Sequence, residues 1–289
     1  MNGWLNILIQ GTLLGGLYAL FAIGLSLIFG IMRLVNLAHG DLIVLAAFVI
    51  LAVMTSFGVD VLTALAISLP VMFAVGFVLQ YVILNRTLGR DILPPLLVTF
   101  GFSIIIQNGL QEAFSADSQR LSAGAIETAS IQLGGGLAVG VMPLLTLLTA
   151  IGVIFALNAL FYWAPLGRAF RATSDDPMTA QLMGIDNRRI FAIAMGIAMI
   201  VTAIAAFYLG IRANFDPSIG PARLIYAFEA VIIGGLGSLW GTLIGGIILG
   251  VAQTIGAHIN PEWQILAGHV AFLVILLLRP RGLFPRAFD

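Results

Sequence analysis

The chain has 289 residues, of which 60% are hydrophobic and 9% are charged. This much apolar surface exceeds what one water-soluble core can bury, so the composition predicts a membrane protein. The formal net charge is zero, which excludes a nucleic-acid partner, and the lack of cysteine excludes disulfides and Cys-ligated metals.

Long apolar stretches, taken in chain order, predict membrane helices. They span residues 5–29, 41–57, 61–84, 92–112, 142–163, 190–210, 225–258 and 262–279. Each except the seventh has about the length of one bilayer crossing, for which roughly 20 residues suffice. The seventh is too long for one span, so we expect two short helices that meet at a glycine break. The predicted fold is an all-α polytopic membrane bundle of about 8–9 segments, forming a single domain over residues 1–289.

Arginine positions predict the orientation, because basic loops stay on the cytoplasmic side. The loop 164–189 holds four arginines and the carboxyl-terminal tail holds three. We therefore expect both in the cytoplasm, and the loops 113–141 and 211–224 outside. The amino terminus is expected outside too, on a helix that the membrane retains because no basic region precedes it. Within 113–141, the alternating run ETASIQLG predicts a short strand.

A polar cluster follows the first stretch. Asn36, His39 and Asp41 lie within six positions, beside Gly40. In one interpretation these side chains bind backbone at a helix break or cap the next helix, whose dipole favours Asp41. In the other, His39 and Asp41 form an acid and base pair. Neither a serine or cysteine nucleophile nor an HExxH metal spacing accompanies that pair.

The charged loop carries the signals of a complete short helix. Pro177 suits the first helical position, because its missing amide hydrogen is not needed there. Asp176 can accept hydrogen bonds from the next free amides, and Gly184 permits a left-handed stop. These signals predict a helix over residues 177–183.

The face of this helix admits two interpretations. Met178 shares a face with Leu182, four residues later, and with Gln181, three residues later. A partner's surface can hold such a helix, with the adaptable side chain of methionine filling the partner's groove. Alternatively, the loop only fixes the topology and its helix lies on the bilayer.

Glycines mark the break in the seventh stretch, at Gly234, Gly235 and Gly237. Small residues at intervals of four, which let helix backbones approach closely, recur around it and in the first stretch. They are Gly237, Gly241 and Gly245; Thr242, Gly246 and Gly250; and Gly11, Gly15 and Ala19.

Glu229 is the deepest acid in these stretches, and a charge at the membrane centre usually has a role or a partner. It either lines a pathway, or pairs with Arg223 near the interface or caps a helix. For His269, near the centre of the last stretch, we expect a neutral side chain bonded to another helix.

Four ordered motifs resemble one family, the LivH-type membrane permeases of branched-chain amino acid ABC importers. NLAHGDL is similar to that family's NFAHGE motif, and GRAFRATSDDPMTAQLMGID to its cytoplasmic coupling segment. EAVIIGGLGSLWGTLIGGIILG resembles its glycine-rich late span, and LLLRPRGLF its carboxyl-terminal signature.

The resemblance implies a non-catalytic permease subunit, without a cofactor, in the bacterial inner membrane. It implies pairing with a homologous second permease and delivery of substrate by a periplasmic binding protein. It also implies two cytoplasmic ATP-binding subunits, which agrees with the lack in this chain of a lysine for a P-loop. These subunits would dock on a coupling helix formed by Asp176, Pro177, Met178, Gln181, Leu182, Met183 and Gly184.

One departure concerns the substrate. Many leucine-type members read Lys-Ala-Phe before the glycine break, followed by Ala or Thr, where this chain has Tyr226, Ala227, Phe228 and Glu229. Branched-chain amino acids, short amides, urea and aromatic acids therefore stay open as substrates. The pathway or helix-break candidates are Asn36, His39, Asp41, Glu229, Gly234, Gly235 and Gly237.

Two other functions compete. A self-sufficient secondary transporter or channel normally shows related halves and several deep acids, whereas this chain shows no convincing internal repeat. An intramembrane enzyme needs a nucleophile with a base or a metal triad, for which His39 and Asp41 are the nearest match.

Overall fold

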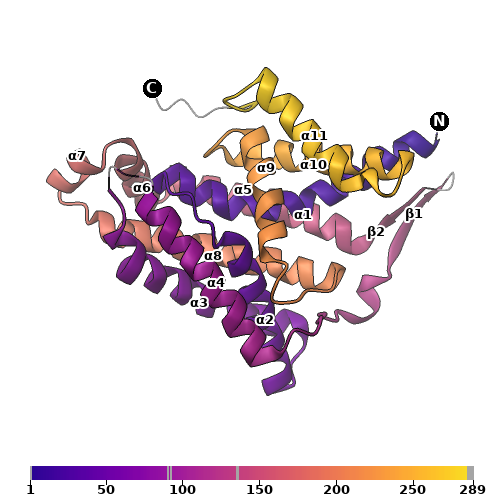
Figure 1. Ribbon diagram of the computed structural model, residues 1–289, viewed down its shortest axis with the longest axis horizontal. Coiled ribbons are helices and arrows are strands. Elements are labelled where there is room, and N and C mark those ends of the chain that lie inside the picture. Colours follow the sequence, from indigo (N-terminus) through magenta and orange to yellow (C-terminus); the bar gives the residue numbers. More distant parts are fainter. Residues whose placement is uncertain (1, 90, 92, 135–136, 285–289) are drawn as a thin grey trace.

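The computed structural model describes residues 2–89, 91, 93–134 and 137–284 (Figure 1). Within them the fold is helical except for one two-stranded hairpin, as predicted. The helices are α1 (Asn2–Met32), α2 (His39–Phe57), α3 (Val61–Val78), α4 (Leu93–Phe114), α5 (Val141–Trp163), α6 (Pro165–Asp175), α7 (Pro177–Leu182), α8 (Asn187–Arg212), α9 (Gly220–Gly234), α10 (Leu239–Ile259) and α11 (Trp263–Leu278). The strands are β1 (Ser130–Gly134) and β2 (Leu137–Gly140).

Seven of the described helices are long and apolar enough to cross a membrane: α1, α2, α3 with its continuation to Arg86, α4, α5, α8 and α10. The apolar helix α11 is shorter, with 16 residues, and α9 has 15 residues. The polytopic bundle is therefore confirmed.

The core forms around α1, which packs against α5, α8, α9 and α10. Small residues make the contact between α1 and α10 possible. A Cβ atom added at Gly15 would overlap the backbone of Ile247, and one added at Gly250 would overlap the carbonyl of Gly11. The predicted role of the spaced glycines in close packing is confirmed.

The seventh apolar stretch is broken as predicted, but not into two short helices. Its first half, α9, starts at Gly220 and ends at Gly234, whereas α10 has 21 residues and is long enough to span. Gly235 and Gly237 adopt φ values of +104° and +79°, which side chains with a Cβ rarely tolerate. The break is therefore built on glycine.

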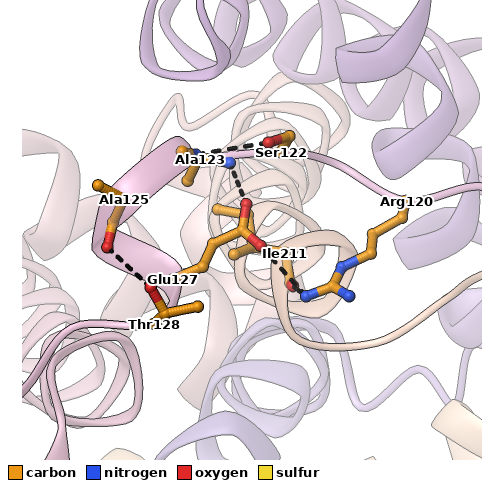
Figure 2. Close-up of polar contacts among 8 residues, drawn as sticks. Arg120, Ser122, Ala123, Ala125, Glu127, Thr128 and Ile211 are labelled. Carbon is orange, nitrogen blue, oxygen red and sulfur yellow. Dashed lines mark hydrogen bonds and ion pairs between the residues drawn. The ribbon is translucent and has the colours of Figure 1, made fainter.

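The two loops predicted to share one side of the membrane do lie together. Gln119 and Phe215 exchange backbone hydrogen bonds of 2.8 and 2.9 Å, which joins the loop after α4 to the loop after α8. In the segment that connects α4 to β1, the Arg120 guanidinium donates hydrogen bonds to the Glu127 carboxylate and to the carbonyl of Ile211 (Figure 2). The predicted strand is present as β1, paired antiparallel with β2.

Figure 1 shows the start of α1 beside this hairpin, with α6 and α7 at the opposite end of the bundle. The Gln10 amide donates to the carbonyl of Ala138 in β2, which ties the two elements together. The amino terminus and the predicted outer loops thus share one end, and α7 lies at the other.

Candidate functional site

The short helix α7 is capped at both ends by the residues that its sequence indicates. Asp176 accepts hydrogen bonds from the amides of Met178 and Thr179 at 3.0 and 3.1 Å and from the Thr179 hydroxyl. These hydrogen bonds hold the pKa of the Asp176 carboxyl below its ordinary value. The bond from the Thr179 hydroxyl has the largest effect, and the bonds from the amides add to it.

The other end closes at Gly184, whose φ of +88° is left-handed. The Gly184 amide donates to the carbonyl of Gln181, and the Ile185 amide donates to that of Ala180. This pair of bonds satisfies carbonyls that a helix end leaves free. The helix itself ends at Leu182, one residue before the predicted end, and Met183 is its C-cap.

The outer face of α7 exposes large apolar side chains. Met178 is 73% exposed, Leu182 is 83% exposed, and Met183 is exposed next to them. Gln181 is exposed on the same helix, whereas Ala180 is buried. A six-residue helix is marginal by itself, so its exposed apolar face is suited to contact another surface.

Helix α6, which the sequence analysis missed, connects α7 to the bundle. Its Ser174 hydroxyl donates to the carbonyl of Gly30 in α1 at 2.7 Å, and its Arg171 donates to the carbonyl of Phe161 in α5. Asn187, at the start of α8, donates to the carbonyl of Pro177. These hydrogen bonds connect α6 and α7 to the three long helices α1, α5 and α8.

The interruption between α1 and α2 covers residues 33–38, and its polar groups bind backbone as the first interpretation predicts. The side-chain carbonyl of Asn36 accepts a hydrogen bond from the backbone amide of Ala38 at 3.0 Å. His39 Nε2 lies 2.8 Å from the carbonyl of Phe21, near the middle of α1. Both side chains are fully buried, so they satisfy backbone groups that lipid cannot.

Asp41 lies in the first turn of α2 and binds other helices rather than His39. It accepts from the Gln107 amide of α4 at 2.9 Å. Its carboxylate also lies against Gly220, the first residue of α9, where the helix dipole favours a negative charge. His39 and Asp41 thus bind different partners, and the structure forms no acid and base pair from them.

Glu229 does not pair with Arg223, so that expectation was wrong. It binds Nδ1 of His269, which lies 40 residues later on α11. The bond across helices predicted for His269 is confirmed. Glu229 is buried and lines none of the described cavities, so its contact serves the packing of α11 on α9.

The carboxyl-terminal segment covers the glycine break. The amides of Leu283 and Phe284 donate to the carbonyls of Ile233 and Gly234 at 2.9 and 3.0 Å. These are carbonyls that the end of α9 would otherwise leave free. Gly234 and Gly235 are therefore closely packed, whereas Gly237 lines a cavity.

Helix α4 carries a polar stripe that the sequence analysis did not identify. Thr99, Ser103, Gln107 and Gln111 recur at intervals of four, which places them on one face. At the predicted outer end of α4, a cavity of about 130 Å³ is lined by Gln107, Gln111, Asp216 and neighbouring residues. The interval of four between these polar residues is the sequence signal that indicates the stripe.

An apolar groove of about 600 Å³ runs beside this stripe, between α3 and α4 over α2. Its lining includes Leu42, next to Asp41, and Ile106, next to Gln107. The polar cavity and the apolar groove are thus lined by neighbouring residues of α4.

Comparison with known proteins decides the family. Residues 7–278 match the family described as branched-chain amino acid transport system / permease component. The chain belongs to this permease family. The permease is 31% identical to the high-affinity branched-chain amino acid transport system permease protein BraD of Pseudomonas aeruginosa, over 98% of this chain and 96% of BraD.

Two further relatives come from Escherichia coli K12. The permease is 27% identical to the permease protein LivH, over 98% of this chain and 96% of LivH. It is also 25% identical to the permease protein LivM, over 93% of this chain and 68% of LivM. Both are high-affinity branched-chain amino acid transport system permeases.

Proposed function

We propose that this permease forms half of the translocation pathway of a binding-protein-dependent ABC importer in the bacterial inner membrane. Two separate ATP-binding subunits dock on α7 and supply the energy. The observation that carries this proposal is the exposed apolar face of a fully capped six-residue helix, at the end of the bundle opposite the hairpin.

The contacts of α6 and α7 support a mechanical route for that energy. When the ATP-binding subunits close on ATP, they move α7 against the bundle. Ser174, Arg171 and Asn187 carry this movement to α1, α5 and α8. The two permeases then switch between inward-facing and outward-facing states at their shared interface.

Likeness to both LivH and LivM supports a homologous permease as the second half of the pathway. A periplasmic binding protein would deliver substrate to the end that holds the hairpin. This places the amino terminus outside and α7 in the cytoplasm, in agreement with the arginines of the loop 164–189.

Branched-chain amino acids fit the path along α4. Polar side chains of the outer cavity would contact the charged amino and carboxyl groups, and the adjoining groove would contact the aliphatic side chain. Glu229 is buried against His269, so its unusual position does not place an acid in this path. We therefore assign leucine, isoleucine and valine as the substrate class.

The docking role can be tested with the assembled transporter. Replacing Met178 with Glu and Leu182 with Gln keeps helix-forming residues but removes the apolar face. We expect recovery of the ATP-binding subunits with the tagged permease to fall about tenfold or more. The control is Ile126→Gln, which alters an exposed apolar side chain at the other end.

Equal recovery from the double variant and from the control would refute docking through α7. The substrate assignment needs a separate measurement, competition for leucine uptake by isoleucine, valine, urea and short amides. Competition by the amides or urea, but not by isoleucine and valine, would refute it.

A further inference from the structure

A cavity of about 180 Å³ lies at the α7 end of the bundle. Its walls come from the last turns of α1 and α5, from α6 and from the start of α10. It is separate from the outer cavity and the groove along α4. Neither the docking face of α7 nor the proposed substrate path explains it.

Two buried polar atoms of this cavity lack a partner. Ser26 is fully buried in α1, and its Oγ makes no hydrogen bond with any of the residues that the structure describes. Asn158 in α5 has a buried Nδ2 that is likewise unpartnered. Both residues line the cavity. An unpaired buried donor is costly, so these atoms indicate that something polar occupies the space.

The remaining polar lining is positive. Arg171 of α6 contributes a guanidinium group, of whose five N–H donors one is used by the carbonyl of Phe161. Helix α10 begins at the cavity with Ser238 as its N-cap, preceded by Gly237, and a helix start favours anions. The described lining residues include no carboxylate.

We propose that this cavity binds the phosphate group of an anionic phospholipid from the leaflet that faces α7. Arg171, Ser26 and Asn158 donate to the phosphate oxygens, and the start of α10 adds its dipole. Basic pockets between membrane helices are recognised sites for anionic headgroups.

The surroundings favour a lipid over a free anion. Tyr162 and Trp240, both exposed, line the cavity, and aromatic side chains of this kind settle at the membrane interface. From Tyr162, exposed Phe155 and Leu148 continue along α5 at intervals of seven. This stripe leads from the cavity toward the middle of α5 and offers an apolar track for an acyl chain.

The experiment uses the purified full-length permease, delipidated in an uncharged detergent. Native mass spectrometry then measures binding of dioleoylphosphatidylglycerol, of dioleoylphosphatidylcholine and of inorganic phosphate. We expect one phosphatidylglycerol to bind more tightly than phosphatidylcholine, and inorganic phosphate neither to bind detectably nor to displace it. Arg171→Gln should weaken phosphatidylglycerol binding about fivefold, and Ser26→Ala about threefold.

Each variant has a matched control. Arg168→Gln removes an exposed arginine one turn earlier on α6, outside the cavity. Ser68→Ala removes a buried hydroxyl that bonds only its own helix α3. Because the Ser26 hydroxyl has no partner, Ser26→Ala tests the site even when Arg171→Gln fails to fold.

Three outcomes would overturn the proposal. Equal affinity for the two lipids would exclude recognition of an anionic headgroup. Displacement of phosphatidylglycerol by inorganic phosphate or leucine at matched concentrations would show a site for a free anion. Unchanged phosphatidylglycerol binding in Ser26→Ala would show that the lipid phosphate binds outside this cavity. The test requires neither ATP nor a second permease, so it is independent of the proposed transport function.

Discussion

The two interruptions in the helical bundle solve the same problem by different chemistry. Between α1 and α2, buried side chains of Asn36 and His39 satisfy backbone groups. Between α9 and α10, Gly235 and Gly237 let the chain turn, and amides of the carboxyl-terminal segment satisfy the free carbonyls. In lipid no water is available for either task, so each broken helix requires its own internal partners.

The difference predicts how each interruption fails. The glycine break depends on space, because the backbones of α9 and α10 touch there. The polar break depends on single hydrogen bonds, each of which one substitution can remove. Steric substitutions at the glycine break should therefore lower stability more than substitutions that remove a hydrogen bond at the polar break.

The largest effect is expected for Gly234→Val. A Cβ atom at Gly234 would overlap the carbonyl of Gly241, so α9 and α10 must separate. We expect a loss of about 3 kcal/mol in stability, seen as a lower apparent Tm by tryptophan fluorescence in detergent. Gly101→Val is the control, since no atom lies near a Cβ added at Gly101 in α4. Equal Tm values for the two variants would contradict the steric account.

A smaller effect is expected for Asn36→Leu. This variant leaves the buried amide of Ala38 without its acceptor, at a cost of about 2 kcal/mol. Asn108→Leu is the matched control, because Asn108 is exposed and bonds only the carbonyl of Ile104 in its own helix. The same thermal measurement should rank Asn36→Leu below Asn108→Leu. The opposite ranking would remove the role assigned to Asn36.

Leu283→Pro tests the cover over the glycine break. Proline lacks the amide that donates to Ile233, so the carbonyl of Ile233 loses its partner at a cost of about 1 kcal/mol. Leu283→Ala keeps the amide and loses only side-chain packing. The proline variant should have the lower Tm; if alanine is equally destabilising, the hydrogen bond does not matter.

The smallest effect is expected in the loop after α4, where the bond between Arg120 and Glu127 is exposed. Glu127→Gln removes the ion pair with Arg120, whose side chain is half exposed, and exposed pairs contribute little. Hydrogen bonding from the Ala123 amide lowers the pKa of Glu127 from its ordinary 4.5. The ionised Glu127 carboxylate therefore stabilises the folded loop at pH values above its ordinary pKa. This stabilisation is lost as the pH falls through the lowered pKa. Hydrogen exchange of the loop amides at pH 7 and pH 3 measures the loss. A larger fall in Tm than for Asn36→Leu would contradict the comparison.

Local signals predicted the parts of the structure that depend on near neighbours. Asp176 and Gly184 define both ends of α7 because capping acts within a few residues. Helix α6 was missed although Pro165 suits a helix start and Gly167, Phe170 and Ser174 mark one buried face. The charged residues beside them are typical of a loop, so they mask this pattern in the sequence.

Contacts distant in sequence could not be predicted. Glu229 finds its partner 40 residues later, in His269, because α11 folds against α9. Likewise, Asp41 meets Gln107 only after α2 and α4 pack together. The cavity at Ser26 and Arg171 combines segments from four parts of the chain. No spacing within a single stretch contains that information.

We propose that the permease has no energy source of its own and receives force through α7. The most direct test measures leucine accumulation in proteoliposomes that contain either the permease alone or the complete transporter with its binding protein. We predict accumulation against the gradient only when the ATP-binding subunits and ATP are present. Uphill accumulation by the permease alone, without nucleotide, would contradict the account.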